Sequence, residues 1–428
     1  MSYSQTLSDR LDSLQAANGD VLRVTSAGRT YEGTLMPHHD FSDPDVLVLK
    51  LNSGYNIGIR IHSGDGVEMI KRPEAPERKQ KEKTVAGDKL RIAIIGTGGT
   101  IASFVDYRTG AVHPALSTDA LVSQVPELGD LAEIDSKVLF SIFSENMAPQ
   151  HWQELALAVA NELNKGAEAV LIPHGTDTMG YTAAALSFML GEIPRPVILV
   201  GAQRSSDRPS SDAASNLLAA ARFAIEQDVA EVCVLMHDSP SDDSFAVHFG
   251  TRVRKMHTSR RDAFHSINVA PLANISPDGV IINHSHRRKG DVKVEAKIEL
   301  EKDVVLLQYF PGMKPWHFER AISGSHGAVV AGSGLGHVNK EMVEFVSKAI
   351  YGGTPVVMTS QCLNGATNLG VYDTGRDLLK AGVITVDDML PETAYVKLMW
   401  SLANSDDVAT TMKTPIANEM SERREMHV

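Results

Sequence analysis

Hydrophobic and polar positions follow two different patterns along this chain. In the first 70 residues, short runs rich in β-branched and aromatic residues are separated by turn-forming pairs such as Ala27-Gly28. Several short strands joined by tight turns predict a small β-barrel domain of the SH3 or Tudor type at residues 1–70. The strands of this barrel are expected at residues 21–25, 31–35, 46–51 and 55–61.

A charged stretch without an apolar face follows the predicted barrel. Between residues 71 and 88, lysine, arginine, glutamate and proline stand close together. This composition is typical of a linker. We therefore expect the barrel to be a separate unit, joined to the rest of the chain by a charged linker at residues 71–88.

From residue 89 on, apolar strands that end in glycine or a polar residue alternate with helical patterns. Trp152, Leu155, Val159 and Leu163 recur at helical spacing after Pro149, a residue that favours the first turn of a helix. Such alternation predicts a mainly parallel sheet with helices on both faces, in which ligands bind beyond the carboxyl ends of the strands. The expected strands are at residues 92–95, 138–142, 170–172, 197–200 and 232–236.

A second, smaller alternating unit begins near residue 304. The predicted fold class is therefore α/β: a two-domain body at residues 89–300 and 301–428 with a mainly parallel sheet, preceded by the small N-terminal β-barrel. The second unit is expected to contain strands at residues 304–309, 328–331 and 356–359 and a helix at 341–350.

Composition and charge narrow the classes of function. The formal net charge of -12 opposes a generally basic surface for nucleic acid. The two cysteines, Cys233 and Cys362, lie in apolar runs, which excludes a disulfide framework or a cysteine zinc site and suits a reducing cytoplasm. The N-terminus lacks a signal-peptide pattern, and no apolar run reaches the roughly 18 residues of a membrane span. We expect a cytoplasmic protein.

The strand at 92–95 runs into a glycine-rich turn, Gly-Thr-Gly-Gly-Thr-Ile at residues 96–101, which leaves Thr100 at the carboxyl end of the strand. The turn does not fit a dinucleotide fingerprint, because Ile101 occupies the third glycine position, and no Gly-Lys-Ser/Thr follows to make a phosphate-binding loop. A tight strand-to-helix turn explains the glycines as well as a ligand does.

The strand at 170–172 ends in a second such turn, Pro-His-Gly-Thr-Asp-Thr-Met at residues 173–179. It brings Thr176 and Asp177 to the same sheet edge, although either of these residues or Thr178 would equally cap the next helix. A threonine hydroxyl needs an activating group, and Lys255 is a candidate, even though its basic segment also fits a solvated stretch. Tyr107 lies in a polar, glycine-ended loop after Thr100.

Taken together, these segments resemble the L-asparaginase family from residue 89 to about residue 402. In that family the Thr-Gly-Gly-Thr-Ile segment carries the nucleophilic threonine, and the His-Gly-Thr-Asp-Thr segment carries a Thr-Asp pair that works with a lysine. Whether Thr100 or Thr176 forms the covalent bond stays open. The positions that match the family's catalytic residues are Thr100, Tyr107, Thr176, Asp177 and Lys255, and those that match its substrate contacts are Ser144 and Glu145.

The sequence departs from this family where a neighbouring subunit normally completes the pocket with an asparagine and an acidic residue. The matching segments are 334–337 and 370–373, and His337 takes the place of the asparagine. This exchange changes the contacts available to the amino group of the substrate. Arg204 lies in a stretch common in the family and receives no catalytic role.

With the barrel and linker included, the whole chain resembles the family of archaeal glutamyl-tRNA(Gln) amidotransferase D subunits. The resemblance implies a glutaminase without a cofactor of its own, which releases ammonia from glutamine or asparagine. It also implies a partner, the amidotransferase E subunit, that binds tRNA(Gln) and uses ATP and Mg, and a homodimeric core within a heterotetramer. One alternative is a free-standing asparaginase or glutaminase. The other is a non-catalytic scaffold, and the intact threonines and lysine argue against this second alternative.

Two weaker motifs remain. His284 and His286 precede a basic run and suggest a metal pair or an RNA contact, but no further ligands have metal-site spacing, so a solvated hairpin is the simpler interpretation. No metal is expected. The glycine-rich segment 332–336 lacks a following lysine and is interpreted as a strand-to-helix turn.

Overall fold

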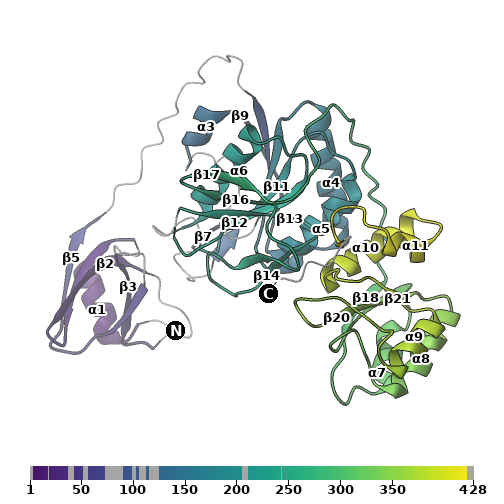
Figure 1. Ribbon diagram of the computed structural model, residues 1–428. Coiled ribbons are helices and arrows are strands. Elements are labelled where there is room, and N and C mark those ends of the chain that lie inside the picture. The colour runs from purple at the N-terminus through teal and green to yellow at the C-terminus, as the bar shows by residue number, and fades with distance from the viewer. Residues whose placement is uncertain are drawn as a thin grey trace.

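The computed structural model describes residues 3–17, 19–36, 43–51, 56–72, 90–98, 103–105, 112–114, 125–204, 211–241 and 243–421. Thr100, Tyr107 and most of the predicted linker lie outside the described residues. The described chain forms an N-terminal antiparallel sheet, an eight-stranded mixed sheet and a four-stranded parallel sheet (Figure 1). The predicted α/β body with a preceding β domain is therefore confirmed.

The N-terminal domain is a five-stranded antiparallel sheet in the order β4-β3-β2-β1-β5. Leu7 and Leu11 of its one described helix pack against the buried side of the sheet, where Leu22, Val24 and Leu47 are hidden from solvent. The sequence pattern missed the last strand, because nearly all of its side chains are exposed and backbone pairing with β1 holds it. The elements are α1 (Gln5–Ser13), β1 (Val21–Ser26), β2 (Arg29–Leu35), β3 (Val46–Leu51), β4 (Asn56–Arg60) and β5 (Gly66–Lys71).

The large sheet has the order β17-β16-β13-β12-β11-β10-β6-β9. Pairings from β12 to β9 are parallel, as predicted, whereas β13, β16 and β17 add antiparallel strands at one side. The strands are β6 (Arg91–Gly98), β9 (Glu133–Ile142), β10 (Ala169–Pro173), β11 (Val197–Val200), β12 (Val232–His237), β13 (Phe245–Phe249), β16 (Ala273–Ser276) and β17 (Gly279–Ile282).

Helices cover both faces of this sheet. One face packs on α4 and α5 and the other on α3 and α6, in two separate apolar clusters. Two short hairpin-like pairs and a turn of 3₁₀ helix stand outside the sheet. These elements are α3 (Glu127–Leu131), η2 (Ser144–Asn146), α4 (Pro149–Asn164), α5 (Met179–Leu190), α6 (Ala213–Glu226), and the paired strands β7 (Ser103–Val105) with β8 (Val112–Pro114) and β14 (Val253–Lys255) with β15 (Phe264–Ser266).

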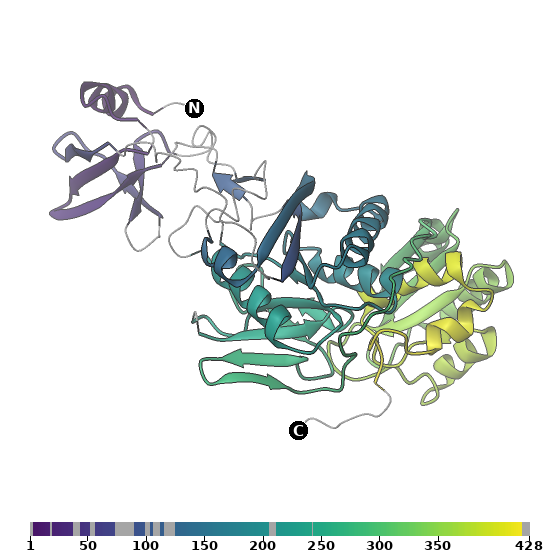
Figure 2. The ribbon, with the colours of Figure 1, turned by 90° about the horizontal axis from the view of Figure 1, so that it is seen from above.

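The second α/β unit contains a parallel sheet in the order β18-β19-β20-β21. Helix α10 contacts α5 of the large unit as well as β18 and β19, so it joins the two units (Figures 1 and 2). The glycine-rich segment 332–336 forms the turn between β19 and α8, as predicted. The elements are β18 (Val304–Gln308), α7 (Pro315–Ile322), β19 (Gly327–Gly332), α8 (Lys340–Tyr351), β20 (Val356–Ser360), α9 (Asp373–Ala381), β21 (Ile384–Thr385), α10 (Pro391–Asn404) and α11 (Val408–Lys413).

The predicted hairpin at His284 and His286 is wrong. The segment is an irregular connection, in which His284 Nε2 lies 3.0 Å from the Ala270 carbonyl oxygen and His286 Nε2 lies 3.1 Å from the Asp228 carbonyl oxygen. The basic run that follows is held by carboxylates, because Arg287 pairs with the buried carboxylate of Glu231, the residue before β12. These side chains fasten the connection to the large unit. Among the described residues, no helix is both long and apolar enough to cross a bilayer.

Glu162 on α4 makes the stability of the fold depend on pH. Its buried carboxylate accepts hydrogen bonds from Arg91 and Lys137 at 3.0 Å and from Lys165 at 3.3 Å. Burial alone would raise the pKa of Glu162, but these hydrogen bonds outweigh it and bring the pKa down to about 2. A carboxyl whose folded pKa lies below its unfolded value stabilises the fold above the unfolded pKa, near 4.5, and this contribution is lost as pH falls towards 2.

We therefore expect Glu162→Gln to lower the urea midpoint of unfolding at neutral pH. The difference between the variant and the unchanged protein should shrink steadily as the pH falls from about 5 towards 2. Urea unfolding followed by circular dichroism at several pH values measures this. A difference that stays constant with pH would show that the carboxylate charge does not contribute.

Candidate active site

The two threonine-containing turns begin side by side at the carboxyl edge of the large sheet. Strands β6 and β10 are parallel neighbours, and Thr97 Oγ1 of β6 donates a hydrogen bond of 3.0 Å to the carbonyl oxygen of Pro173, the last residue of β10. Thr97 is buried, so this bond ties the two strand ends together inside the protein. The parallel order thus brings the start of both predicted motifs to one edge, where ligands of such sheets bind.

Lys255 reaches the second turn from β14. Its Nζ lies 2.8 Å from Thr176 Oγ1 and 2.8 Å from Asp177 Oδ1. The Lys255 side chain is only 14% exposed, whereas that of Asp177 is 67% exposed. The interpretation of Lys255 as part of a solvated basic stretch is therefore wrong. An ammonium group stands between a buried hydroxyl and a carboxylate that opens to solvent.

Helix capping does not account for the polar residues of this turn. Helix α5 begins at Met179 with Thr178 as its N-cap residue, and no side-chain cap hydrogen bond is present there within the described chain. Thr178 Oγ1 instead donates to the carbonyl oxygen of Ser144 at 2.7 Å. The side chains of Thr176 and Asp177 accept hydrogen bonds from Lys255 instead of capping the helix. Thr178 connects the turn to η2.

Ser144 packs directly against the turn, because Gly175 has no side chain. Ser144 is buried, and Glu145 beside it is exposed. A Cβ atom at Gly175 would lie 2.7 Å from the Ser144 Cβ, which is closer than two carbon atoms approach. The glycine therefore lets the segment that carries the predicted substrate contacts lie next to Thr176.

Replacing Gly175 with alanine tests this close approach. We expect kcat/KM for amide hydrolysis to fall by roughly 10²-fold, because displacement of the turn by about 1 Å misplaces groups that must meet the substrate. The control is Gly129→Ala, since a Cβ atom at Gly129 meets no neighbour within 4 Å. Steady-state ammonia release measures both variants, and equal activity of the two would contradict the packing argument.

The loop that follows β11 lines the site, which the sequence did not predict. A Cβ atom at Gly201 would lie 2.6 Å from Thr176 Cγ2, so this loop touches the threonine. The buried carboxylate of Asp212 accepts hydrogen bonds from the backbone N–H groups of Gln203 and Arg204 and thereby fixes the loop. The segment at residues 201–204 is the stretch common in the asparaginase family, but its contact with Thr176 was not predicted from it.

The two segments that depart from the asparaginase pattern meet at the carboxyl edge of the other sheet. The ring of His337, after β19, packs edge-to-face on Tyr372, before α9, with 5.1 Å between ring centroids. Burial lowers the pKa of His337, so its ring is neutral at physiological pH. Neither ring nitrogen has a hydrogen-bond partner in the described part of the chain. This histidine therefore brings no positive charge to the position of the family's asparagine.

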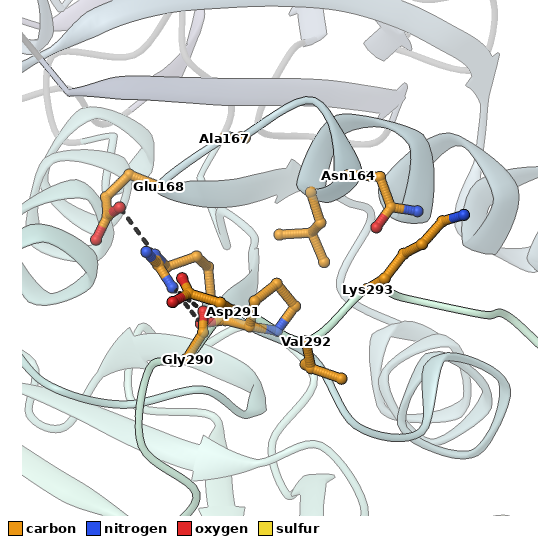
Figure 3. Close-up of a pocket in the computed structure, with 11 residues that line it drawn as sticks. Asn164, Ala167, Glu168, Gly290, Asp291, Val292 and Lys293 are labelled. Atoms are coloured by element: carbon orange, nitrogen blue, oxygen red, sulfur yellow. Dashed lines mark hydrogen bonds and ion pairs between the residues drawn. The ribbon is translucent and has the colours of Figure 1, made fainter.

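A cavity of about 260 Å³ lies at the opposite edge of the large sheet, before the start of β10 (Figure 3). Its lining includes Glu168, which accepts a hydrogen bond of 2.9 Å from Arg195 Nε and pairs with Lys289 Nζ at 2.9 Å. The carboxylate of Glu168 is thus neutralised by two basic side chains. The cavity lies before the start of β10 and Thr176 lies after its end, so the length of this strand separates them. We assign the cavity no part in the chemistry.

One cluster could hold a cation on geometric grounds. Glu301, Asp303 and His326 place one ligand atom each within 4.8 Å of the others. The hydrogen bond with Glu301 raises the pKa of His326, and it already engages the Nδ1 atom of the ring. The cluster is exposed or half-exposed, and its residues lie just before β18 and β19. We assign no metal to it.

Three family models match successive parts of the chain. A GatD N-terminal domain model matches residues 16–70, an asparaginase N-terminal model matches residues 91–288, and a glutaminase/asparaginase C-terminal domain model matches residues 303–414. Their order follows that of the antiparallel sheet, the eight-stranded sheet and the four-stranded sheet.

Known proteins resemble the chain along nearly its whole length. The glutamyl-tRNA(Gln) amidotransferase D subunit of Thermococcus kodakarensis is 48% identical over 413 residues, which cover 94% of each protein. The D subunit of the same enzyme from Pyrococcus furiosus is 50% identical over 397 residues, covering 92% of this chain and 90% of the relative. The thermostable L-asparaginase from Thermococcus kodakarensis superposes with a TM-score of 0.70 at 32% identity and covers 78% of this chain and 100% of that enzyme. The chain therefore belongs to the family of glutamyl-tRNA(Gln) amidotransferase D subunits, whose catalytic body is built on the asparaginase fold.

Proposed function

We propose that this chain is the glutaminase component of a tRNA-dependent amidotransferase and releases ammonia from the side-chain amide of glutamine or asparagine. The observation that carries the proposal is the ammonium of Lys255 between the hydroxyl of Thr176 and the carboxylate of Asp177. A hydroxyl in contact with a positive charge loses its proton at lower cost, which is what a threonine needs for acyl transfer.

In the proposed reaction, the oxygen of Thr100 attacks the amide carbon, and the set of Thr176, Asp177 and Lys255, or Tyr107, takes up its proton. The tetrahedral intermediate then breaks its carbon–nitrogen bond, and ammonia leaves with a proton returned by the same set. Water hydrolyses the ester, which releases glutamate and restores the threonine. Thr176 is the alternative nucleophile, because Lys255 contacts its oxygen directly.

The carboxylate group of the substrate is assigned to Ser144, and its amino group is assigned to Glu145. The position of η2 supports this assignment. Ser144 of η2 packs against Gly175 and accepts a hydrogen bond from Thr178, and both of these residues belong to the turn that carries Thr176. We propose that a second copy of the chain completes this pocket with its segments around His337 and Tyr372, in a homodimeric core.

The proposed partner is a different protein, the amidotransferase E subunit, which binds tRNA(Gln), uses ATP and Mg and receives the ammonia. A homodimer of this chain with two copies of that partner would form the heterotetramer. The relatives from Thermococcus kodakarensis and Pyrococcus furiosus are D subunits of glutamyl-tRNA(Gln) amidotransferases, which supports a complex that works on tRNA. A reaction on tRNA in translation also supports a cytoplasmic location.

Ammonia release from the purified chain tests the proposal. We expect slow release from glutamine or asparagine by the chain alone and a clear increase when the E subunit, ATP, Mg and glutamyl-tRNA(Gln) are added. The likeness to a free-standing L-asparaginase favours the second candidate, an independent asparaginase or glutaminase. Rapid hydrolysis that the added components leave unchanged would select that candidate, and no hydrolysis in any mixture would contradict both.

A further inference from the structure

A buried chain of hydrogen bonds lies beneath the turn that carries Thr176 and Asp177. His174, the residue after β10, is fully buried, and its Nδ1 lies 2.6 Å from the carbonyl oxygen of Gly175. Its Nε2 lies 2.9 Å from Thr182 Oγ1 on α5, and Trp152 Nε1 on α4 donates to the same oxygen at 3.0 Å. The reaction proposed above uses none of these three side chains.

Donor and acceptor chemistry assigns the direction of every bond in this chain. A carbonyl oxygen only accepts, so the proton of the imidazole is on Nδ1 and donates to Gly175. Burial lowers the pKa of His174 to about 4, so the ring is neutral at physiological pH and Nε2 carries no proton. Thr182 therefore donates its hydroxyl proton to Nε2 and accepts from the indole N–H of Trp152, which is only a donor.

The bond to Gly175 acts on Thr176 through the peptide that joins them. Because a peptide is planar, holding the Gly175 carbonyl towards His174 also holds the N–H and the Cα of Thr176. The side chain of Thr176 is packed against Gly201 and hydrogen-bonded to Lys255, so a rotated peptide would move its oxygen away from that ammonium.

We propose that His174 is a positioning residue, whose Nδ1–H bond to the Gly175 carbonyl holds the peptide before Thr176 and thereby the Thr176 hydroxyl against Lys255. Helices α4 and α5 contribute Trp152 and Thr182 to this arrangement. These two side chains keep the imidazole in the tautomer that donates from Nδ1. The inference rests on the proposed amidase function, because it assigns a role within that site.

A pair of near-isosteric substitutions separates positioning from mere filling of the core. Asparagine places an amide N–H where Nδ1 stands, whereas glutamine places its amide near Nε2, so His174→Asn keeps the donor to Gly175 and His174→Gln loses it. We expect the glutamine variant to lose about 10²-fold in kcat with little change in KM, because the misplaced oxygen matters in the reaction rather than in substrate binding. The asparagine variant should stay within about fivefold of the unchanged enzyme.

Substitutions of Thr182 give an independent arm that leaves the histidine in place. Thr182→Ser keeps the hydroxyl that donates to Nε2 and should retain activity. Thr182→Val removes that donor and the acceptor for Trp152, which frees the imidazole to take the other tautomer, and should lower kcat by about tenfold or more. Thermal unfolding midpoints show that each variant is folded at the assay temperature.

Ammonia release from glutamine and from asparagine is measured for the full chain under conditions in which the unchanged protein turns over. Equal kcat values for His174→Asn and His174→Gln, or for Thr182→Ser and Thr182→Val, in folded protein would overturn the positioning role. Lys255→Ala in the same assay defines the background. If ammonia release by the unchanged protein does not exceed that background, the amidase proposal itself is wrong. If the unchanged protein is active but the paired variants have equal kcat values, only the positioning role is wrong.

Discussion

Replacing Lys255 with methionine is expected to lower ammonia release from glutamine by at least about 10²-fold, because members of a catalytic set that work as a unit each cost that much or more when removed. The substitution keeps the length of the side chain and removes the charge that lies 2.8 Å from both Thr176 Oγ1 and Asp177 Oδ1. The hydroxyl then loses its activating partner. Steady-state kcat and KM for glutamine and asparagine, measured with full-length protein, test the expectation.

Lys289 provides the matched control for this experiment. Its side chain is 16% exposed, against 14% for Lys255, and its Nζ also pairs with a carboxylate, that of Glu168, at 2.9 Å. Its partner Glu168 lines the cavity of Figure 3, at the sheet edge opposite Thr176. Lys289→Met should therefore destabilise the protein to a similar degree and leave kcat unchanged. Equal losses of activity in the two variants would show that Lys255 serves the fold rather than the reaction.

Replacing Lys397 with methionine is expected to lower the free energy of unfolding by about 3–5 kcal/mol, the usual cost of breaking a buried ion pair from one side. Lys397 on α10 and Glu419 near the end of the described chain form an ion pair with both side chains 0% exposed. Burial lowers the pKa of Lys397, while Glu419 acts in the opposite direction. Without the ammonium, the carboxylate would stay buried, and its donors among the described residues would be the backbone N–H groups of Ile416 and Ala417.

Urea unfolding monitored by circular dichroism measures this cost. The double variant Lys397→Met with Glu419→Gln should recover much of the loss, because a neutral amide replaces the unpaired charge. The exposed pair of Lys348 and Glu344 on α8 gives the control, and Lys348→Met there should produce no measurable change. Similar midpoints for the Lys397 and Lys348 variants would contradict the assigned importance of the buried pair.

Regular elements with strong periodicity were predictable from the sequence. Strand β11 occupies the same four residues, 197–200, that the apolar run predicted, and α4 begins at Pro149 as its spacing indicated. Strands β13, β16 and β17 were not predicted. Strands β16 and β17 are short, half-exposed strands without a clear alternation of apolar residues, whereas β13 is fully buried. The sequence therefore described the parallel core well and its antiparallel extension poorly.

The candidate site divides in a similar way. The rule that parallel strands end at one edge was enough to place Thr176 and Asp177 beyond β10. The partnership with Lys255 came from the family resemblance, because β14 is only three residues long and carries no pattern that identifies its neighbours. Gly201 lies in a stretch common in the family, but no pattern indicated that it touches Thr176. The contact of His174 with Thr182 had no signal beyond ordinary core residues.

By itself, the sequence determined the α/β class, the order of the units and the edge of the sheet at which Thr176 stands. Periodicity supports such conclusions, because it records which face of each element is turned away from water. Only the tertiary structure decided which side chains meet across elements: Lys255 with Thr176, Gly201 with Thr176, and Trp152 with Thr182 and His174. The reason is physical, since these contacts depend on the packing of segments up to 79 residues apart, which no local pattern encodes.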